Sequence, residues 1–368
     1  MQSRIPLSET NIVCDFDIQT SSIDKKPLKD FEFVIEDYLK NDKKVVALNS
    51  GTSAIHLALI LSGVTVGDEV LCQSFTYIAT VNPIIYQNAK PIFIDSEKDT
   101  WNMCPKHLES AIIDRISKGK KPKAIIIVHL YGMPAKMEEI VHISKKYNIT
   151  LIEDAAEALG SEYNGRKCGT IGDFGILSFN NNKILSTLGG GALICNSEKE
   201  KELAFFYATQ SKEKSIYFDH KKTGYNYRMN TLAAVLGINQ FKYLKENIKK
   251  RRDINDFYTS YFINSKDVKT LTEKSNKYFS NQWLSCIELK CDDAEFKIER
   301  IRKSLDTNNI ESRFLWKPMH LQPIFKDKPY YGANVSEKLF RSGLCLPSGS
   351  NLNNNVLNKI SSIIHKLL

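Results

Sequence analysis

The stretch that decides the fold runs from Asp173 to Lys183, Asp-Phe-Gly-Ile-Leu-Ser-Phe-Asn-Asn-Asn-Lys, and a three-glycine turn follows at 189–191. Its apolar half has the composition of a buried β-strand, which ends in small polar residues. A single lysine, Lys183, stands among those polar residues and ahead of the flexible glycines. A lysine held on a rigid element in this way is placed to take part in chemistry, so the rest of the chain is interpreted around it.

Apolar segments of strand length recur on both sides of this stretch and alternate with helical periodicity. They occupy residues 44–48, 69–72, 91–95, 124–130, 150–154 and 192–195. Continuous apolar strands separated by helices are typical of a largely parallel sheet that is covered on both faces. Ligands bind such sheets beyond the carboxyl ends of the strands, where Asp154, Ser178, Lys183 and the residues after His129 are predicted to lie.

The pattern changes after a long helical stretch that is predicted from about Thr231 to Tyr261 and connects two domains. Beyond it we expect a strand at 283–289, a helix at 293–308 and an amphipathic C-terminal helix. The predicted fold class is therefore α/β, with a large domain over residues 1–245 and a smaller α+β domain over residues 246–368.

Composition and charge exclude several classes of protein. Hydrophobic residues make up 42% of 368, enough for a large core without disulfides or metals, and the net charge is +9. The lysines are scattered, which favours a solvated surface over a nucleic-acid site and is compatible with an anionic small substrate. The eight cysteines lack metal-site spacing and indicate free thiols in a reducing compartment. We find no signal peptide or membrane-length segment, so we expect a cytoplasmic protein without bound metal or membrane contact.

The segment Asn49-Ser50-Gly51-Thr52-Ser53 separates the strand at 44–48 from a predicted amphipathic helix. Such a junction leaves backbone N–H groups free at a helix start, and small residues allow an anion such as phosphate to approach them. Serine or threonine before a helix is also an ordinary N-cap, so this motif does not decide the function alone.

Four features together match the needs of a pyridoxal 5'-phosphate enzyme. Lys183 supplies an amine for a Schiff base with the cofactor, and Asp154, which ends a strand, supplies a carboxylate for the pyridine nitrogen. An aromatic residue in Ser74-Phe75-Thr76-Tyr77 can stack on the ring. The turn at 51–53 can bind the phosphate.

With these features the sequence resembles a known family, the DegT/StrS-type nucleotide-sugar aminotransferases, which have the aspartate-aminotransferase (type I) fold. The resemblance covers nearly the whole chain, and its specific motifs are Asn49–Ala54, Glu153–Gly160, Ser178–Lys183 and Gly224–Met229. The distal runs Glu311–His320 and Cys345–Gly349 look most like the bacterial branch that aminates UDP-linked 4-keto-6-deoxy-N-acetylhexosamines at C4. That branch feeds diacetamido sugars of the bacillosamine type and nonulosonic acids of the legionaminic type.

The resemblance implies a role for each matched residue. Lys183 is the Schiff-base lysine and proton shuttle, Asp154 pairs with the pyridine nitrogen, and Tyr77 stacks on the ring. The remaining residues implied to contact the cofactor are Gly51, Thr52, Ser53 and Ser178 at the phosphate, Glu157 beside the ring, and Asn226, which reaches the phosphate from a second subunit. The implied assembly is therefore a homodimer with shared active sites.

The resemblance also implies a ping-pong reaction in which L-glutamate is the amino donor and pyridoxamine phosphate is the intermediate form of the cofactor. Arg228 and Arg313 are candidates for the diphosphate of the UDP-sugar, and Arg313 and His320 are expected to meet substrate. The N-terminal segment is shorter than in relatives, where this region helps to shape the sugar pocket, and Phe314 replaces a common proline.

Several alternatives stay open. The enzyme could aminate C3 or a differently configured C4 ketone, or the chain could be a non-catalytic regulator that binds the cofactor. A sugar 3-dehydratase is disfavoured because Lys183 is present. Each residue also has an ordinary structural interpretation: Tyr77 and His320 as core residues, Ser178 as a strand end, Asn226 as a turn residue, Arg313 as a salt-bridge partner, and His129 as a structural histidine, which we prefer.

Overall fold

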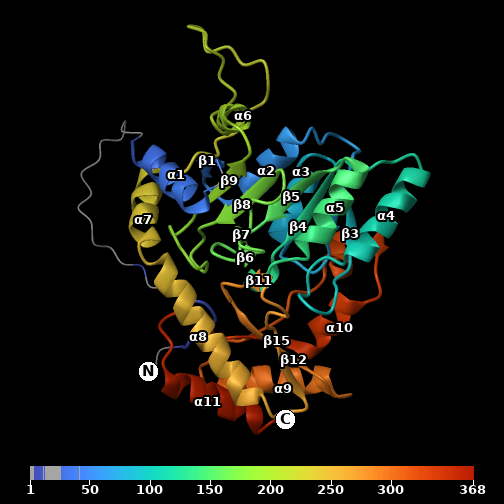
Figure 1. Ribbon diagram of the computed structural model, residues 1–368, viewed down its shortest axis with the longest axis vertical. Helices are drawn as coiled ribbons and strands as arrows, with labels where there is room; N and C mark the ends of the chain where they lie inside the picture. Colours follow the sequence, from blue (N-terminus) through green and yellow to red (C-terminus); the bar gives the residue numbers. More distant parts are fainter. Residues whose placement is uncertain (1–3, 11, 13–25, 41) are drawn as a thin grey trace.

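The computed structural model describes residues 4–10, 12, 26–40 and 42–368 of the chain (Figure 1). The N-terminal segment that is predicted to be shorter than in relatives consists mostly of residues 13–25. These residues, which include Cys14, lie outside the described part of the chain. The other seven cysteines are free. In the described part of the chain, no helix has the length and apolar character needed to cross a membrane.

Within the described residues, an eight-stranded sheet forms the centre of the large domain, in the order β1-β9-β8-β5-β4-β2-β3-β14. Its strands are β1 (Lys44–Leu48), β2 (Glu69–Gln73), β3 (Lys90–Ile94), β4 (Ala124–Val128), β5 (Thr150–Asp154), β8 (Phe174–Ser178), β9 (Gly191–Cys195) and β14 (Tyr330–Tyr331). Neighbours from β8 to β14 pair in parallel. Strand β9 runs antiparallel to both β8 and β1. The predicted mostly parallel α/β sheet is confirmed.

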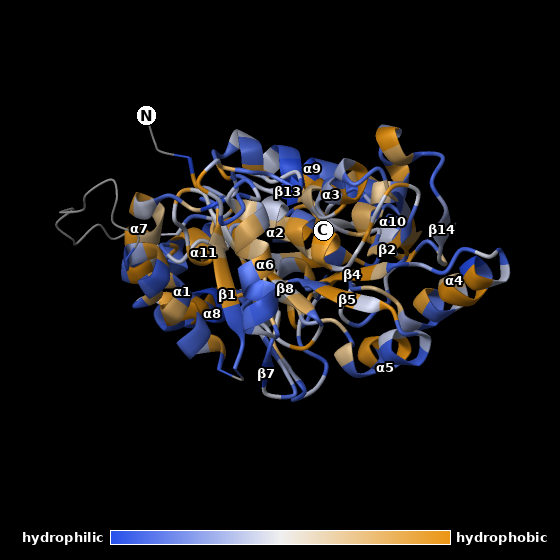
Figure 2. Ribbon diagram, turned by 90° about the horizontal axis from the view of Figure 1, so that it is seen from above, coloured by the Kyte–Doolittle hydropathy of each residue, from blue (hydrophilic) through white to orange (hydrophobic). Residues whose placement is uncertain are grey.

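Helices cover both faces of this sheet, which is why its strands read as continuous apolar segments. Ile125 and Ile127 of β4 pack with α4 (Pro105–Ser117) and α5 (Met137–Tyr147) on one face. Ala124 and Ile126 pack on the other face, which is covered by α2 (Gly51–Leu61), α3 (Asn82–Tyr86) and α6 (Glu198–Ala208). Helices α1 (Lys26–Leu39) and α7 (Thr231–Phe241) pack against β1 and β9. Figure 2 shows the hydrophobic character of β4 and β5 between these helices.

The C-terminal part contains an antiparallel sheet in the order β10-β12-β15-β13, as expected for an α+β domain. The strands are β10 (Val268–Thr270), β12 (Ser285–Leu289), β13 (Arg313–Phe314) and β15 (Gly343–Leu346). The helices around them are α8 (Leu244–Phe262), α9 (Ala294–Thr307), α10 (Val335–Ser342) and α11 (Asn354–His365). A small sheet of β6 (Glu162–Tyr163), β7 (Arg166–Lys167) and β11 (Tyr278–Phe279) joins the two parts. The domain boundary at 245/246 stays a prediction, and β14 from beyond it lies in the large sheet.

The helical stretch predicted as continuous from Thr231 to Tyr261 is two helices, α7 and α8. The amides of Lys242 and Tyr243 bond to carbonyls three residues earlier, and this tight turn separates the helices. Helix α7 packs closely on α1, where a Cβ on Gly237 would lie 2.5 Å from the Phe31 ring. Helix α8 then runs into the small domain (Figure 1), so the turn lets each helix follow its own domain.

Candidate active site

A cavity of about 400 Å³ opens at the carboxyl ends of β4, β5 and β8. The last residues of these strands, Val128, Asp154 and Ser178, all contribute to its wall. The wall is completed by segments from both domains, namely 49–52, the 76–80 region, Glu157, the loop at 180–183, Gly189, Gly190, Trp283, Arg313 and Trp316. The parallel pairing of adjacent strands therefore gathers the predicted residues at one edge of the sheet.

Lys183 reaches this cavity from the loop after β8. Its backbone N–H donates to the Asn180 carbonyl at 3.0 Å, which folds the loop into a tight turn. Its Nζ lies 3.5 Å from Glu157 Oε1 and 4.0 Å from the centroid of the Trp283 ring. Only 12% of the side chain is exposed, so the amine lies at a largely buried position on the cavity wall.

Asp154 is buried and accepts hydrogen bonds from neutral donors. Thr80 Oγ1 donates to Oδ2 at 2.7 Å, and the Ala156 amide donates to Oδ1 at 3.2 Å. Burial raises the pKa of Asp154, and these two hydrogen bonds offset the rise only in part. A cationic group bound in the cavity beside Asp154 would stabilise its charged form.

Glu157 connects the amine to the segment that follows β4. Its Oε2 accepts from the Tyr131 amide at 2.7 Å, and Tyr131 adopts a left-handed conformation with φ of 57°. Burial raises the pKa of Glu157, although the nearby charge of Lys183 lowers it. The carboxylate is thus held in a fixed orientation beside Lys183.

The start of α2 forms another part of the wall. Ser50 caps the helix, because its Oγ accepts from the Ser53 amide at 3.1 Å. Gly51 and Thr52 line the cavity, and a Cβ on Gly51 would lie 3.2 Å from Cβ of Ser178. Glycine therefore allows the helix start to approach the end of β8. Ser53, predicted at the phosphate, is a buried residue, and its Oγ donates to Asn49 Oδ1 at 2.7 Å.

Aromatic rings form the remaining wall. Tyr77 is 53% exposed, and its ring centroid lies 5.4 Å from that of Trp316. Trp316 stacks on Tyr131, and its backbone N–H donates to the Tyr131 hydroxyl at 2.9 Å. Thr80, Trp283 and Trp316 were not among the residues predicted from the sequence. Thr80 lies one helical turn beyond Tyr77, and Trp316 lies within the distal run, but no pattern pointed to Trp283.

The predicted substrate residues differ in position. Arg313 lines the cavity and bonds to Glu311 Oε1 at 2.7 Å. Arg228 does not line it; its Nη1 donates to Glu32 Oε1 at 2.6 Å. His320 does not line it either.

Both ring nitrogens of His320 have partners, with Nδ1 2.7 Å from Ser74 Oγ and Nε2 3.2 Å from Glu337 Oε1. The buried His129 is held in the same way. Its Nε2 lies 3.0 Å from Glu153 Oε2, and its Nδ1 accepts from the Ala135 amide. This arrangement agrees with the structural interpretation of His129.

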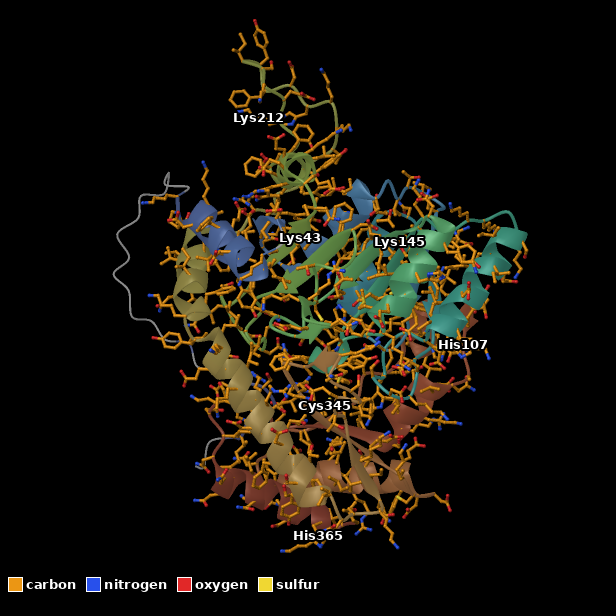
Figure 3. The ribbon with its side chains drawn as sticks, in the orientation of Figure 1. Lys43, His107, Lys145, Lys212, Cys345 and His365 are labelled. Atoms are coloured by element: carbon orange, nitrogen blue, oxygen red, sulfur yellow. The ribbon has the colours of Figure 1, made fainter. Side chains whose placement is uncertain are left out.

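Asn226 lies on the segment between α6 and α7, outside this cavity. It is exposed, and its carbonyl accepts from Asn49 Nδ2 at 3.2 Å. The segment after α6 projects from the large domain, and Figure 3 shows Lys212 on the projection. The contact of Asn226 with the phosphate site of a second subunit stays a prediction.

The donor set fits pyridoxal phosphate. Lys183 offers an amine for the aldehyde, and the buried Asp154, whose bonded donors are neutral, suits a protonated ring nitrogen. Gly51, Thr52 and Ser178 could hold the phosphate at the helix start. In contrast, no group of three or more His, Cys, Asp and Glu side chains within the described ranges is placed to bind a metal ion.

Comparison with known proteins matches residues 18–365 to the model of the DegT/DnrJ/EryC1/StrS aminotransferase family. The chain belongs to this family. It is 44% identical over 326 residues to the putative pyridoxal phosphate-dependent aminotransferase EpsN of Bacillus subtilis, covering 88% of this chain and 83% of that protein. It is 36% identical over 307 residues to GDP-perosamine synthase of Escherichia coli O157:H7, covering 83% and 81%.

Two further relatives bear on substrate and fold. The UDP-4-amino-4,6-dideoxy-N-acetyl-beta-L-altrosamine transaminase of Campylobacter jejuni is 36% identical over 254 residues, which cover 68% of this chain and 66% of that protein. The putative sugar aminotransferase Spr1654 of Streptococcus pneumoniae, in its PLP form, superposes with a TM-score of 0.88 at 25% identity, covering 99% of this chain and 100% of that one. The protein is therefore a pyridoxal phosphate-dependent sugar aminotransferase with the type I fold.

Proposed function

We propose that this aminotransferase moves the amino group of L-glutamate to the C4 keto group of a UDP-linked 4-keto-6-deoxy-N-acetylhexosamine. The product is a UDP-4-amino-4,6-dideoxy sugar for bacterial surface glycan synthesis. The observation that carries the chemistry is the meeting of Lys183, Asp154 and the α2 start in one cavity. The similarity to the Campylobacter jejuni UDP-sugar transaminase supports the choice of sugar.

Pyridoxal phosphate, when bound, supplies an aldehyde that carries the amino group and a ring that withdraws electrons. Lys183 Nζ would move the proton from the α-carbon of glutamate to the bound cofactor in the first half-reaction and from the cofactor to C4 of the sugar in the second, so the amine would end each half-reaction as it began. Asp154 keeps the ring nitrogen protonated, and its burial excludes water from that contact. Glu157 orients the Lys183 amine from 3.5 Å.

Five further predicted residues would bind the ligands. Gly51, Thr52 and Ser178 receive the phosphate at the helix start, and the exposed Tyr77 stacks on the ring. Arg313 contacts the substrate from the small domain.

We also propose a cytoplasmic homodimer in which Asn226 completes the phosphate site of the second subunit. The exposure of the projecting segment supports this, because Ile216, Tyr217 and Phe218 on it are 82%, 80% and 61% exposed. Apolar side chains at such a site are stabilised when a partner covers them.

The test is an absorbance titration of the bound cofactor, first with L-glutamate and then with UDP-4-keto-6-deoxy-N-acetylglucosamine. We expect the spectrum to change with glutamate and to return with the sugar, and neither to occur in Lys183→Ala. The GDP-linked 4-keto-6-deoxyhexose serves as the matched control. A spectrum restored by the GDP-sugar alone would overturn the choice of nucleotide, and NMR of the product distinguishes C4 from C3 amination.

A further inference from the structure

The amine of Lys183 is held on two sides in this structure. Glu157 Oε1 lies 3.5 Å from Nζ, and the face of the Trp283 ring lies 4.0 Å away. An ammonium over an aromatic face is attracted by the ring quadrupole, and the attraction is strongest for tryptophan and larger where water is excluded. Trp283 is 2% exposed, so this contact is desolvated.

Trp283 is fixed to the lysine loop itself. Its Nε1 donates to the carbonyl of Asn182, the residue before the lysine, at 2.8 Å. Its backbone N–H donates to Asn281 Oδ1 at 2.9 Å, and its carbonyl accepts from Arg251 Nη1 at 2.6 Å. The indole therefore has a fixed position relative to Lys183, although it comes from the C-terminal half of the chain.

Arg251 extends this network to the N-terminal segment. Its guanidinium is fully buried, and it donates to Ser8 Oγ and Thr10 Oγ1 at 3.1 and 3.2 Å, so its bonded acceptors are neutral. Burial lowers the pKa of Arg251 to about 9. Burying a cation without a carboxylate is unfavourable, and the hydrogen bonds of Arg251 to the Trp283 carbonyl, Ser8 and Thr10 offset part of this cost.

Residues 8–10 also contact the lysine loop directly. Thr10 Oγ1 donates to the Lys183 carbonyl at 2.6 Å, and Ser8 Oγ donates to the Asn182 carbonyl at 2.8 Å. The backbone of the loop is thus held by the N-terminal segment, while the Lys183 amine is held by Glu157 and Trp283.

We infer that Trp283 is a positioning residue that holds the free amine of Lys183 between the two half-reactions. The inference rests on the proposed function, because transamination releases this amine and needs it again in every cycle. A long lysine side chain without such a contact samples many rotamers. The tryptophan face keeps the amine within reach of the reacting carbon, with Glu157 on its other side.

The test uses Trp283→Phe, which keeps a ring with a weaker attraction, and Trp283→Leu, which removes the π face. Trp101→Phe is the matched control, since Trp101 is equally buried but lies outside this network. The first readout is the rate at which an N-hydroxysuccinimide ester labels Lys183 in cofactor-free protein, measured by mass spectrometry. The exposed Lys249 provides the internal reference.

We expect Lys183 labelling to rise by about twofold to thirtyfold in Trp283→Leu, the range given by cation–π strengths, and by less in Trp283→Phe. Labelling in Trp101→Phe should equal that of the wild type. In the loaded enzyme, kcat should fall in the same order while KM for glutamate changes little. If Trp283→Leu does not fold, Trp283→Tyr replaces it in the graded series.

Equal labelling of Lys183 in the wild type and all folded Trp283 variants would overturn the inference. So would equal changes in Trp283→Phe and Trp283→Leu, which would indicate space-filling alone. A graded labelling series in a protein that aminates no UDP-sugar would refute the proposed substrate while leaving the role of Trp283 intact.

Discussion

Replacement of Arg228 by methionine tests whether this arginine binds substrate or stabilises the fold. Arg228 Nη1 donates to Glu32 Oε1 at 2.6 Å and to the Ala47 carbonyl at 2.8 Å. The Ala47 amide in turn donates to the same Glu32 oxygen at 2.8 Å. This network ties α1 to β1, and its two charged side chains are only 17% and 8% exposed.

The size of the effect follows from the burial of Glu32. Removing one member of a buried ion pair costs about 3–5 kcal/mol, because the remaining charge has no partner. Arg228 retains some exposure, so we expect the lower end, about 3 kcal/mol. With an unfolding entropy of roughly 2.1 cal/mol/K per residue, this lowers Tm by about 4 °C for a chain of this length.

The assay combines differential scanning fluorimetry with KM for the UDP-sugar. The double variant with Glu32→Gln should recover much of the stability, because it removes the unpaired charge. KM should change less than threefold, a factor that corresponds to about 0.6 kcal/mol. An Arg228→Met protein with wild-type Tm and a strongly raised KM for the sugar would refute this reasoning and support the substrate role predicted from the sequence.

Three further predictions concern the cavity and the core. Asp154→Asn should lower kcat by about 10²–10³-fold. Because burial raises the pKa of Asp154, the folded cofactor-free protein binds more protons than the unfolded chain above pH 3.8, and its stability falls as the pH rises. The Tm measured from pH 4 to 7 should therefore fall less in the variant than in the wild type. Gly51→Ala places a Cβ 3.2 Å from Ser178 and should weaken cofactor binding about tenfold in a titration, the order expected for overpacking; unchanged affinity would contradict the assignment of this helix start. Burial lowers the pKa of His56 to about 4, so between pH 6.5 and 4 the unfolded state binds a proton that the folded state does not, and the Tm falls with pH. His56→Asn should reduce this fall in Tm. An equal dependence of Tm on pH in the variant and the wild type would exclude a contribution of His56.

Features that depend on local sequence were predictable. The apolar strands, the position of Asp154 at the end of β5 and the loop that carries Lys183 follow from periodicity, since parallel strands bring their carboxyl ends to one edge. The break between α7 and α8 was not predicted, because the apolar periodicity continues through it. The break depends on the packing of the two helices against different domains. Strand β14 is only two residues long and pairs with β3, so no pattern marks it.

Contacts between distant residues were not predictable. Arg228 and His320 have side chains suited to an anionic substrate, but their partners Glu32 and Glu337 decide where they point. Trp283 joins the site through the Asn182 carbonyl, 101 positions away, and Arg251 through backbone groups of other segments. Residue type and spacing carry no information on such pairings.

The placement of residues 4–10 also has a consequence for the order in which the chain folds. The Ile5 amide donates to the Asn309 carbonyl, the Glu311 amide donates to the Ile5 carbonyl, and the Ser348 amide donates to the Leu7 carbonyl. Domains form progressively during synthesis, starting from the N-terminal side. These early residues must nevertheless wait for positions 309–348 to leave the ribosome before they can dock. Residues 5–7 therefore reach their final positions only after the small domain is complete, although Ser8 and Thr10 contact a loop that leaves the ribosome much earlier.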